Sequence, residues 1–389
     1  MKVAFFSNFL NHHQLPMCEA FLAHSEIDFK FVACKKISEE RINMGYRDMN
    51  TSYDFVVRAY DDENEAMRIA TEYDIVIFGA APTKYLAKRM ALKKITFRFC
   101  ERSFKRGTWR RFIPMTRKKI REGYTAYKNE PLFLLASSAF ASSDLALCGF
   151  NADKCFKWGY FPEVGQKTAE ELLPKKRQGD ILNVLYAGRL IKLKRVIDTV
   201  KAVERIVRSG EQRIVFTIIG DGEEKTKIQK YVKNKNLEQH VKFLPFIPSD
   251  MVREYMDAAD AFVIGSNFYE GWGAVVNEAM SSCCVPVVSH SVGSAAYLIS
   301  NGANGLIYPL GNIKALEKCL RTLIEKDDVR ASMALSAYKT VTELWCAPVA
   351  VNRFVKLCSG ILSGECCGVQ YETGPISRAE IIKNNWIDK

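Results

Sequence analysis

One stretch restricts the fold of this chain more than any other: a short apolar run that a glycine-containing loop joins to an apolar helix. The run Ala261–Ile264 has the brevity and the β-branching of a buried parallel strand. After Gly271 and Gly273, apolar residues recur at helical spacing between Ala274 and Met280. This order predicts a βα unit of a parallel α/β sheet, with the loop at the edge where such sheets bind ligands.

The glycine loop is also the first candidate site. Gly273 lies near the expected helix start, where free N–H groups and the helix dipole favour an anion, so Gly273, Ala274 and Val275 are candidates to hold phosphate. Glu270 precedes them and Glu278 follows inside the helix, so that one carboxylate could meet a sugar and the other a ribose. Alternatively, Glu270 only favours the helix N-terminus and Glu278 is solvated. For this spacing alone, the second interpretation is the more frequent one.

A second candidate loop follows the expected strand at 181–187. Arg189 can grip a diphosphate with its planar guanidinium group, and Lys194, which opens the next helix, adds a point charge. Gly188 begins this loop and is assigned to the same site. Taken alone, each cation would most often be an ordinary surface residue.

The remaining chain continues the alternation of strands and helices. The polar stretch 161–180 is expected to link two domains. The run 131–135 is expected to begin a helix, and 144–147 to form a strand. The other strands are expected at 3–6, 29–33, 53–57, 74–78, 95–99, 155–160 and 214–219, and the segment 241–248 as a shorter strand that runs into a turn.

Four motifs in a fixed order suggest a family: Gly188–Lys194, Glu270–Glu278, Cys284–Ser289 and Asn301–Pro309. Together they resemble the retaining glycosyltransferases of family four, within glycosyl transferases group one. These enzymes have the α/β GT-B architecture, two facing Rossmann-like doubly wound domains with a cleft between them. The resemblance is strong from about 181 to 341 and weak before 145. The chain departs from the family pattern at Ser294, where a second glycine is usual, and at Tyr297, where a glutamate is usual.

The resemblance implies a division of labour between two domains. Residues 1–165 would form an acceptor-binding domain, onto which a C-terminal helix at about 350–389 packs back, and residues 180–345 would bind the nucleotide sugar. In the family, the positions of Arg189 and Lys194 hold the diphosphate, and that of Glu270 holds the sugar. The position of Glu278 holds the ribose, and the backbone beside Ile247 meets the nucleobase.

Four residues of the N-terminal half are candidates for the same reaction. Asn11, His12 and His13 lie in the loop after the first expected strand, where the family often has glycines that close over the donor phosphates. These histidines could touch the donor or the acceptor, or could only make hydrogen bonds within the loop. Many family members have a histidine near the end of a later strand, and this chain offers Glu101 there.

The net charge of +12 comes from one segment. Lys84–Arg121 contains fifteen Lys or Arg residues and one acidic residue, and interleaves them with Trp109, Phe112 and Ile113. Because no nucleic-acid-binding module is recognisable, we expect no nucleic-acid partner. An anionic membrane surface is the expected partner. The alternative is a solvated helix face without a partner.

Composition excludes several classes of protein. The start of the chain lacks the apolar segment of a signal peptide, and no stretch is apolar enough to span a membrane. Twelve cysteines without such a leader predict a reducing compartment, and Cys283-Cys284 and Cys366-Cys367 lack zinc-site spacing. We therefore expect a cytoplasmic protein, peripheral on the inner face of the cytoplasmic membrane, with no cofactor and no metal.

The leading hypothesis is a retaining glycosyltransferase. It would move a hexosyl group from a nucleotide sugar, a UDP-sugar in our expectation, to a hydroxyl of a cell-envelope glycan or a lipid-linked acceptor. Two alternatives remain open. One is a catalytically idle nucleotide-sugar-binding subunit of an envelope assembly complex, and the other is a sugar-nucleotide epimerase of similar fold.

Overall fold

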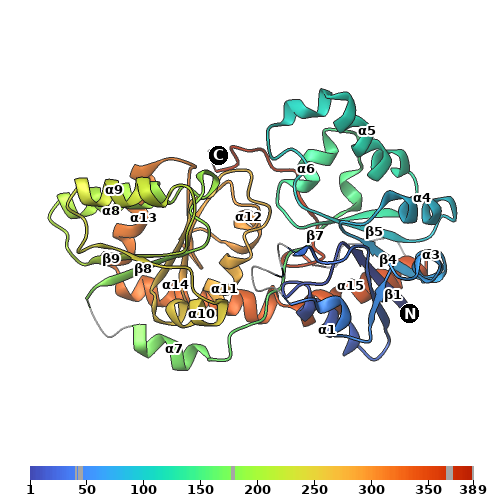
Figure 1. The fold of residues 1–389 in the computed structure, drawn as a ribbon, viewed down its shortest axis with the longest axis horizontal. Helices are drawn as coiled ribbons and strands as arrows, with labels where there is room; N and C mark the ends of the chain where they lie inside the picture. Colours follow the sequence, from blue (N-terminus) through green and yellow to red (C-terminus); the bar gives the residue numbers. More distant parts are fainter. Residues whose placement is uncertain (40–41, 43–46, 177–179, 365–370, 388–389) are drawn as a thin grey trace. The chain divides into compact units, whose positions relative to one another are not determined.

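The computed structural model describes residues 1–389 except 40–41, 43–46, 177–179, 365–370 and 388–389 (Figure 1). The chain forms two compact units. The N-terminal unit comprises Met1–Pro162 and Cys346–Lys383, and the C-terminal unit comprises Glu163–Trp345 and the residues from Asn384 on. The chain passes from one unit to the other after Pro162 and after Trp345, close to the expected domain boundaries at 165 and 345. The stretch 350–389 was expected to pack on the N-terminal domain, but its last residues, from Asn384 on, belong to the C-terminal unit.

The N-terminal unit is built on a seven-stranded parallel sheet with the order β3-β2-β1-β4-β5-β6-β7. In its centre, Val3 lies opposite Phe29 on one neighbouring strand and Ile75 on the other. The central strands are buried on both faces, as parallel strands in α/β proteins are. The strands are β1 Lys2–Ser7, β2 Asp28–Ala33, β3 Val56–Arg58, β4 Ile75–Phe78, β5 Thr96–Cys100, β6 Leu132–Ala136 and β7 Cys155–Lys157.

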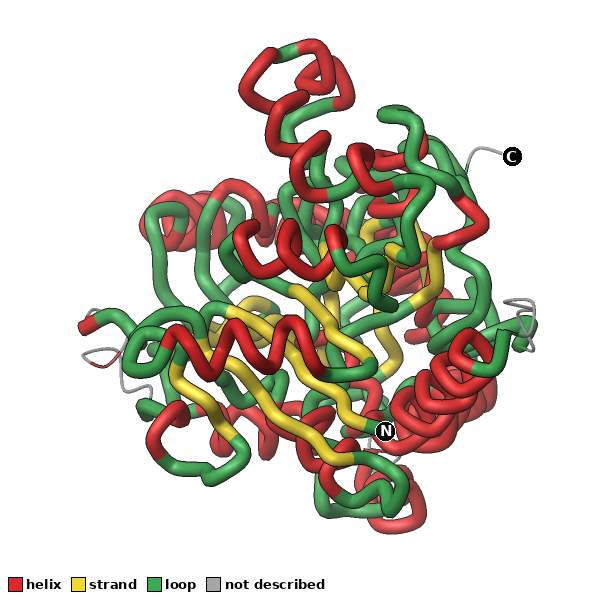
Figure 2. The backbone as a smooth tube through the Cα atoms, turned by 90° about the vertical axis from the view of Figure 1, so that its right-hand side faces the viewer, coloured by secondary structure: helices red, strands yellow, loops and turns green. Residues whose placement is uncertain are grey.

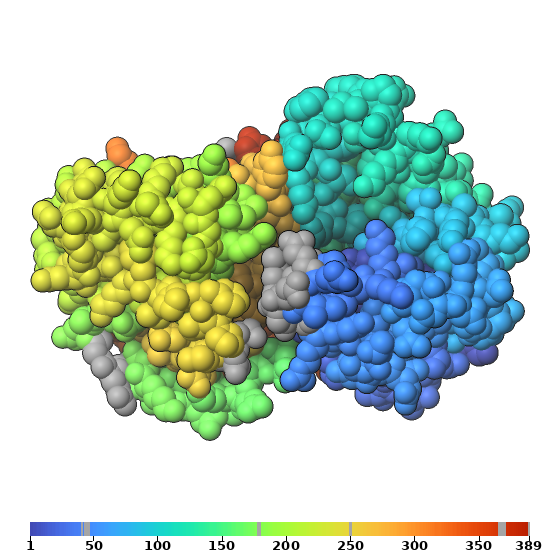
Figure 3. Space-filling model, in the orientation of Figure 1, coloured from blue at the N-terminus to red at the C-terminus, as the bar shows by residue number. Residues whose placement is uncertain are grey.

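Helices cover both faces of this sheet (Figure 2). On one face α3, α4 and α5 lie side by side, and on the other α1 packs against α15, whose Phe354 contacts Phe21 and Phe97. The helices are α1 Leu15–Leu22, α3 Glu63–Glu72, α4 Thr83–Ala91, α5 Pro114–Gly123, α6 Ala141–Ala146 and α15 Ala347–Leu362. Short 3₁₀ turns are η1 Met49–Thr51, η2 Thr108–Phe112, η3 Thr125–Tyr127 and η4 Ala152–Lys154. The turn η2 and helix α5 form part of the turquoise surface of the N-terminal unit in Figure 3.

Two expected elements of this unit are wrong. Residues 131–135 do not begin a helix, because 132–135 form most of strand β6, and 144–147 do not form a strand but lie at the end of α6. Each residue from Leu132 to Ala136 is buried, so the run shows no alternation that would mark it as a strand.

The C-terminal unit is built on a six-stranded parallel sheet with the order β10-β9-β8-β11-β12-β13. Its core cluster joins apolar residues of these strands to helices α8, α13 and α14. The strands are β8 Leu182–Ala187, β9 Ile214–Ile219, β10 Val241–Leu244, β11 Ala261–Ile264, β12 Val285–Ser289 and β13 Leu306–Tyr308.

The helices of this unit form two layers: α8, α9 and α13 lie on one side of the sheet, and α7, α10, α11 and α14 on the other (Figure 1). Helix α7 lies within the stretch expected as a linker, of which 177–179 are outside the described residues. The helices are α7 Ala169–Lys176, α8 Val196–Arg208, α9 Lys225–Asn234, α10 Ser249–Ala258, α11 Val275–Ser281, α12 Ala295–Leu298, α13 Ile313–Glu325 and α14 Asp327–Lys339. The 3₁₀ turn η5 Lys192–Lys194 precedes α8, and a π-helical turn, η6 Thr340–Leu344, follows α14.

In each sheet the strand order reverses beside the first strand. The reversal lies between β1 and β4 in the N-terminal unit and between β8 and β11 in the C-terminal unit. Doubly wound sheets bind ligands at the carboxyl ends of strands at such a switch point. The loops after β8 and β11 carry the candidate donor residues, and the loop after β1 carries His12 and His13.

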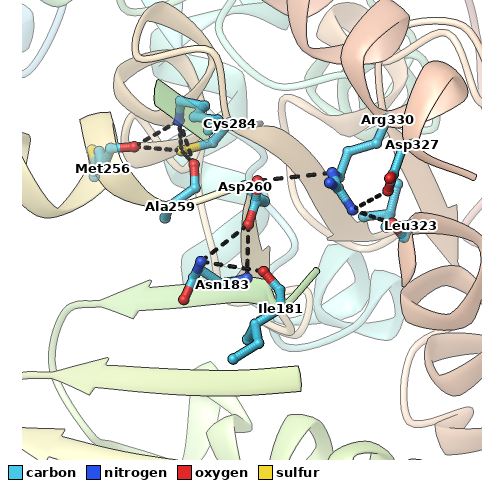
Figure 4. Close-up of polar contacts among 10 residues, drawn as sticks. Ile181, Asn183, Met256, Ala259, Asp260, Cys284, Leu323, Asp327 and Arg330 are labelled. Atoms are coloured by element: carbon cyan, nitrogen blue, oxygen red, sulfur yellow. Dashed lines mark hydrogen bonds and ion pairs between the residues drawn. The ribbon is translucent and has the colours of Figure 1, made fainter. Parts of the chain in front are cut away.

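A buried polar network fixes the opposite ends of β8 and β11 (Figure 4). Asp260, which precedes β11, accepts a hydrogen bond of 2.8 Å from the backbone N–H of Asn183. Its carboxylate also lies 3.7 Å from the guanidinium Nε of Arg330, and Arg330 donates to the carbonyl of Leu323 over 2.7 Å. Burial raises the pKa of Asp260. Because an unpaired buried charge is costly, this network holds α13 and α14 at the end of the sheet remote from the candidate site.

Candidate functional site

An ion pair joins the two candidate loops of the C-terminal unit. Lys194 ends turn η5 after β8, and Glu270 lies in the loop after β11. Lys194 Nζ is 2.5 Å from Glu270 Oε2, and the two side chains are 17% and 15% exposed. A pair that is this sheltered from water interacts more strongly than an exposed one. The structure thus brings together two residues that the sequence separates by 76 positions.

Backbone contacts keep the same two loops close together. The N–H of Asn267 donates to the carbonyl of Leu193 over 2.9 Å. A Cβ atom on Gly265 would lie 3.0 Å from the hydroxyl oxygen of Tyr308, a tight contact, and 3.4 Å from the carbonyl oxygen of Lys194, an ordinary one. The glycine after β11 therefore leaves room for the Tyr308 hydroxyl beside the loop that carries Lys194.

The loop after β8 is pressed against the loop after β9. A Cβ atom on Gly220 would lie 2.1 Å from the carbonyl oxygen of Gly188, and one on Gly222 would lie 2.5 Å from that of Leu190. All three glycines have positive φ, at +148° for Gly188, +137° for Gly220 and +150° for Gly222. Only glycine fits here, and the contact fixes the backbone on both sides of Arg189.

Arg189 itself points its side chain outward from this loop. Its carbonyl accepts a hydrogen bond of 2.8 Å from the hydroxyl of Tyr186, and its side chain is exposed. Burial raises the pKa of Tyr186. The negative charge of Glu270 raises this pKa further, whereas the positive charge of Arg189 lowers it. Among the described residues, Arg189 forms no ion pair.

Gly273 is buried and has φ of +84°, and a Cβ atom there would lie 3.0 Å from Val292. Helix α11 begins two residues later than Gly273, at Val275, and is seven residues long. The N–H groups of Gly273, Ala274 and Val275 donate to no acceptor within the described part of the chain. Ala274 and Val275 are partly buried. Three successive N–H groups are thus left available beside Glu270.

Glu278 lies on α11, one helical turn beyond these N–H groups. Its carbonyl accepts hydrogen bonds from Arg253 on α10 over 2.8 Å and from the hydroxyl of Ser281 over 2.9 Å. Its side chain is partly buried. The helix is therefore held in place from the side of α10, with Glu278 on a fixed backbone.

Ile247 follows β10 and is partly buried, two residues beyond Pro245. Its neighbour Phe246 is 77% exposed, which excludes packing of that ring in the core. The backbone of this strand end contacts the loop after β9, because the N–H of Gly220 points to the carbonyl of Leu244 at 3.4 Å.

The candidate residues of the N-terminal unit converge on Tyr160. Glu101 follows β5, and its carboxylate pairs with Lys105 at 2.6 Å and accepts from the hydroxyl of Tyr160 at 3.3 Å. The ring of His13 stands edge-on to that of Tyr160 with centroids 6.3 Å apart, and His12 and His13 have centroids 3.9 Å apart. The structure thus brings Glu101 and both histidines to the carboxyl edge of this sheet.

The loop that carries these histidines is held by its own side chains. Asn11 accepts a hydrogen bond from the N–H of His13 over 3.1 Å and donates to Gln14 over 2.9 Å, and Gln14 donates to Ser7 over 3.3 Å. Burial lowers the pKa of His13. A neutral imidazole held in this way can accept or donate a proton.

Tyr160 is the residue of this cluster that the sequence did not single out. It lies three residues beyond β7, and Phe99 contacts its ring with centroids 5.5 Å apart. Its position at the end of the last expected strand of the domain was the one available signal, because ligand-facing residues lie at strand ends in such sheets.

The basic segment Lys84–Arg121 is not exposed throughout, which corrects the expectation that all of it faces an anionic surface. Arg89 is buried and donates to five acceptors, including the carbonyls of Ala70 and Asp74, and burial lowers its pKa to about 9. Arg102 is buried against Asp144, with 3.2 Å between the charged atoms. These two cations hold the fold together.

Lys84, Lys88 and Lys93 are exposed, and a second exposed part of the segment is 106–121. Three large apolar side chains project from it: Trp109 is 59% exposed, Phe112 68% and Met115 82%, whereas Ile113 is partly buried. The exposed cations around them are Arg106, Arg117, Lys118, Lys119 and Arg121, and Arg110 and Arg111 are partly exposed.

Within the described ranges, none of the helices is both long and apolar enough to span a bilayer. Among the same residues, no group of three or more His, Cys, Asp or Glu side chains has an arrangement that could hold a metal ion.

Comparison with known proteins identifies a family domain in the C-terminal unit. Residues 170–340 match the family model of glycosyl transferases group 1. The C-terminal unit carries the domain of this family. Lys194 and Glu270 both lie inside the matched range. The expected recognition is confirmed at this level.

Curated relatives match this domain over part of their length. The chain is 28% identical over 171 residues to N-acetyl-alpha-D-glucosaminyl L-malate synthase of Bacillus anthracis, a match that covers 44% of this chain and 43% of that protein. It is 27% identical over 167 residues to N-acetylgalactosamine-N,N'-diacetylbacillosaminyl-diphospho-undecaprenol 4-alpha-N-acetylgalactosaminyltransferase of Campylobacter jejuni, covering 43% of this chain and 42% of that protein. The matches thus span less than half of these two relatives.

Solved structures match nearly the whole chain in fold. Anabaena HepE, solved in complex with UDP, is 16% identical with a TM-score of 0.68, and the match covers 94% of this chain and 100% of that one. The lipopolysaccharide outer core galactosyltransferase WaaB is 17% identical with a TM-score of 0.61, and covers 88% of this chain and 99% of that one. The expected GT-B fold class of two Rossmann-like doubly wound domains is confirmed.

Proposed function

We propose that this protein is a glycosyltransferase that moves a hexosyl group from a nucleotide sugar, a UDP-sugar, to a hydroxyl acceptor. The observation that carries the proposal is the ion pair between Lys194 and Glu270, because it places a cation and a carboxylate together beside three available N–H groups at a sheet switch point. Structures of the similar HepE were solved in complex with UDP and with UDP-glucose, which supports this class of donor.

The donor would lie across the loops after β8 and β11. Arg189, Lys194 and the N–H groups of 273–275 would hold the pyrophosphate, because fixed cations and N–H donors stabilise an anion without reorganising. Gly188 would let the backbone of the loop after β8 come close to the pyrophosphate. Glu270 would accept hydrogen bonds from the sugar hydroxyls. Glu278 would hold the ribose hydroxyls, and the backbone at Ile247 would meet the base.

The reaction would proceed with retention at the anomeric carbon and without a metal. The bond between that carbon and the phosphate oxygen breaks while the acceptor oxygen bonds from the same face. The departing phosphate takes the acceptor proton, so the nucleoside diphosphate leaves as the protonated product. Arg189 and Lys194 would stabilise the charge that grows on this phosphate, which is the term that accelerates the chemical step.

The N-terminal unit would bind the acceptor. Glu101, His12, His13 and Tyr160 lie together at the carboxyl edge of its sheet. The carboxylate of Glu101 and a neutral His13 can accept hydrogen bonds from acceptor hydroxyls, and Tyr160 orients Glu101.

The acceptor would be a cell-envelope glycan or a lipid-linked precursor, reached from the inner face of the cytoplasmic membrane. The exposed face at 106–121 supports this location, because it combines cations with Trp109, Phe112 and Met115. An anionic leaflet attracts each nearby Lys or Arg by about 1 kcal/mol, and aromatic side chains settle at the interface. No nucleic acid is proposed as a partner.

The direct test measures nucleotide release from a panel of nucleotide sugars in the presence of membrane extract. Turnover that Glu270→Ala abolishes supports the proposal. Donor binding without turnover under every acceptor condition would instead indicate an idle binding subunit. Conversion of the donor sugar with no acceptor present would indicate an epimerase.

A further inference from the structure

A cavity of about 300 Å³ lies in the C-terminal unit, between the loop after β8 and the first turns of α8 and α9. Both helices lie on the same side of the sheet. None of the residues proposed to bind the donor lines this cavity. The donor residues gather at β8 and β11, whereas the cavity lies toward β9, on the other side of β8.

The charged side chains that line the cavity leave an excess of positive charge. Four cations and two carboxylates face it: Lys192, Arg195, Lys201, Lys227, Asp198 and Glu224. Arg195 pairs with Asp198 at 2.7 Å, and Lys227 pairs with Glu224 at 3.0 Å. Lys192 and Lys201 form no ion pair within the described part of the chain, although the ammonium of Lys201 lies 5.9 Å from the ring centre of Tyr231. Two positive charges therefore remain uncompensated.

The start of α8 adds two available backbone donors to these charges. The helix is thirteen residues long, begins at Val196, and has no side-chain cap. The N–H groups of Val196 and Ile197, which both line the cavity, donate to no acceptor among the residues that the structure describes. Arg195 in the left-handed conformation, with φ of +52°, turns the chain into the helix at this point. The helix dipole places positive potential at these N–H groups.

We propose that this cavity is a binding site for a phosphate monoester. The dianion of such a group matches the two unpaired ammonium groups, and its three terminal oxygens can accept from Lys192, Lys201 and the N–H groups of α8. Leu190 and Ile228 supply an apolar wall. The cavity is at the small end of the range for ligand pockets, so it fits a sugar phosphate and not a nucleotide.

Binding is tested by isothermal titration calorimetry with glucose 6-phosphate at constant ionic strength, using the full chain. The unmodified protein should show saturable binding, and Lys192→Gln/Lys201→Gln should weaken it about tenfold or more, since charge-assisted hydrogen bonds are lost. Glucose without phosphate should not bind. The charge-retaining Lys192→Arg/Lys201→Arg should keep most of the affinity, which separates loss of charge from loss of folding.

Two controls decide where the phosphate binds. Lys230→Gln/Lys233→Gln removes the same charge from exposed positions of α9 that do not line the cavity, and should leave the affinity unchanged. Lys194→Gln, which alters the proposed donor site, should also leave it unchanged. The proposal is overturned if no saturable binding occurs, if both double glutamine variants weaken binding equally, or if Lys194→Gln abolishes binding while Lys192→Gln/Lys201→Gln retains it. None of these outcomes depends on glycosyl transfer.

Discussion

The ammonium of Lys194 lies 2.5 Å from the carboxylate of Glu270, and the two side chains come from loops that follow neighbouring strands of the C-terminal sheet. This contact sets the distance between the proposed phosphate-binding cation and the proposed sugar-binding carboxylate. It also gives each residue a separate, measurable role, because a nucleoside diphosphate lacks the sugar that Glu270 would contact.

Replacing Glu270 should therefore affect transfer more than nucleotide binding. For Glu270→Ala we expect the rate of nucleotide release to fall about 100-fold or more, the scale for losing one group that stabilises a transition state. The affinity for UDP should change less than about tenfold. Glu238→Ala, at an exposed position of the same unit, serves as the control. An unchanged rate of release in Glu270→Ala would contradict the proposed role.

The contact between Gly220 and Gly188 should make Gly220 intolerant of any side chain. A Cβ atom at Gly220 would lie 2.1 Å from a backbone oxygen, so we expect Gly220→Ala to lower the free energy of unfolding by about 3 kcal/mol or more. Gly210 also has positive φ but open space around it, so Gly210→Ala should cost only about 1 kcal/mol of backbone strain. Urea denaturation followed by circular dichroism measures both. An equal loss of unfolding free energy in Gly220→Ala and Gly210→Ala would show that the loop at Gly220 relaxes around the added methyl group.

Burial of His13 predicts a pH dependence of stability. The folded protein holds the pKa of His13 below its ordinary value of 6.5, so the stability that the neutral ring contributes is present above that pH. It is lost as the pH falls from 6.5 toward the lower pKa of the folded state. The free energy of unfolding should fall less steeply in His13→Gln than in the unmodified protein between about pH 7 and about pH 5.

An NMR titration of the histidine ring protons measures the pKa of His13 in the folded protein directly, and His13→Gln identifies which signal belongs to His13. The His13 midpoint should lie below 6.5. A midpoint above that value would show that a nearby carboxylate outweighs burial.

The exposed face at 106–121 should bind anionic vesicles. In flotation with phosphatidylglycerol vesicles, Arg110→Glu/Arg111→Glu/Lys118→Glu/Lys119→Glu should reduce the bound fraction about tenfold or more, because each cation contributes about 1 kcal/mol. Serine at Trp109, Phe112 and Met115 should weaken binding even at high salt, since apolar insertion is not screened.

The matched control for this surface reverses four exposed lysines of the C-terminal unit: Lys230, Lys233, Lys242 and Lys314. This control should float as the unmodified protein does. If both quadruple variants lose binding equally, net charge alone is responsible and the proposed face is excluded.

Most elements of the fold could be predicted from local patterns. The two elements whose type was predicted wrongly, at 131–135 and 144–147, show where such patterns fail. Leu132–Ala136 is buried on both faces, so its apolar run has no period that separates a strand from a helix. Asp144 lies on helix α6, and its carboxylate accepts from the backbone N–H of Phe104 over 2.8 Å, a contact that no local pattern reveals.

The donor loops could be predicted from motif order, whereas the contact between them could not. Lys194 and Glu270 meet because β11 lies beside β8, although β9 and β10 intervene in the sequence. Tyr160 was missed for the same reason, since its partner Glu101 lies 59 positions earlier on another strand end. Sheet order decides both contacts, and it is a property of the whole domain.

The central claim is that the loops after β8 and β11 hold the pyrophosphate of a nucleotide sugar, and calorimetric titration with UDP tests it most directly. We predict saturable binding of UDP by the unmodified protein and a loss of about tenfold or more in affinity for each of Arg189→Gln and Lys194→Gln, as charge-assisted hydrogen bonds are removed. Equal affinity for UDP in the unmodified protein and in both folded variants would contradict the account.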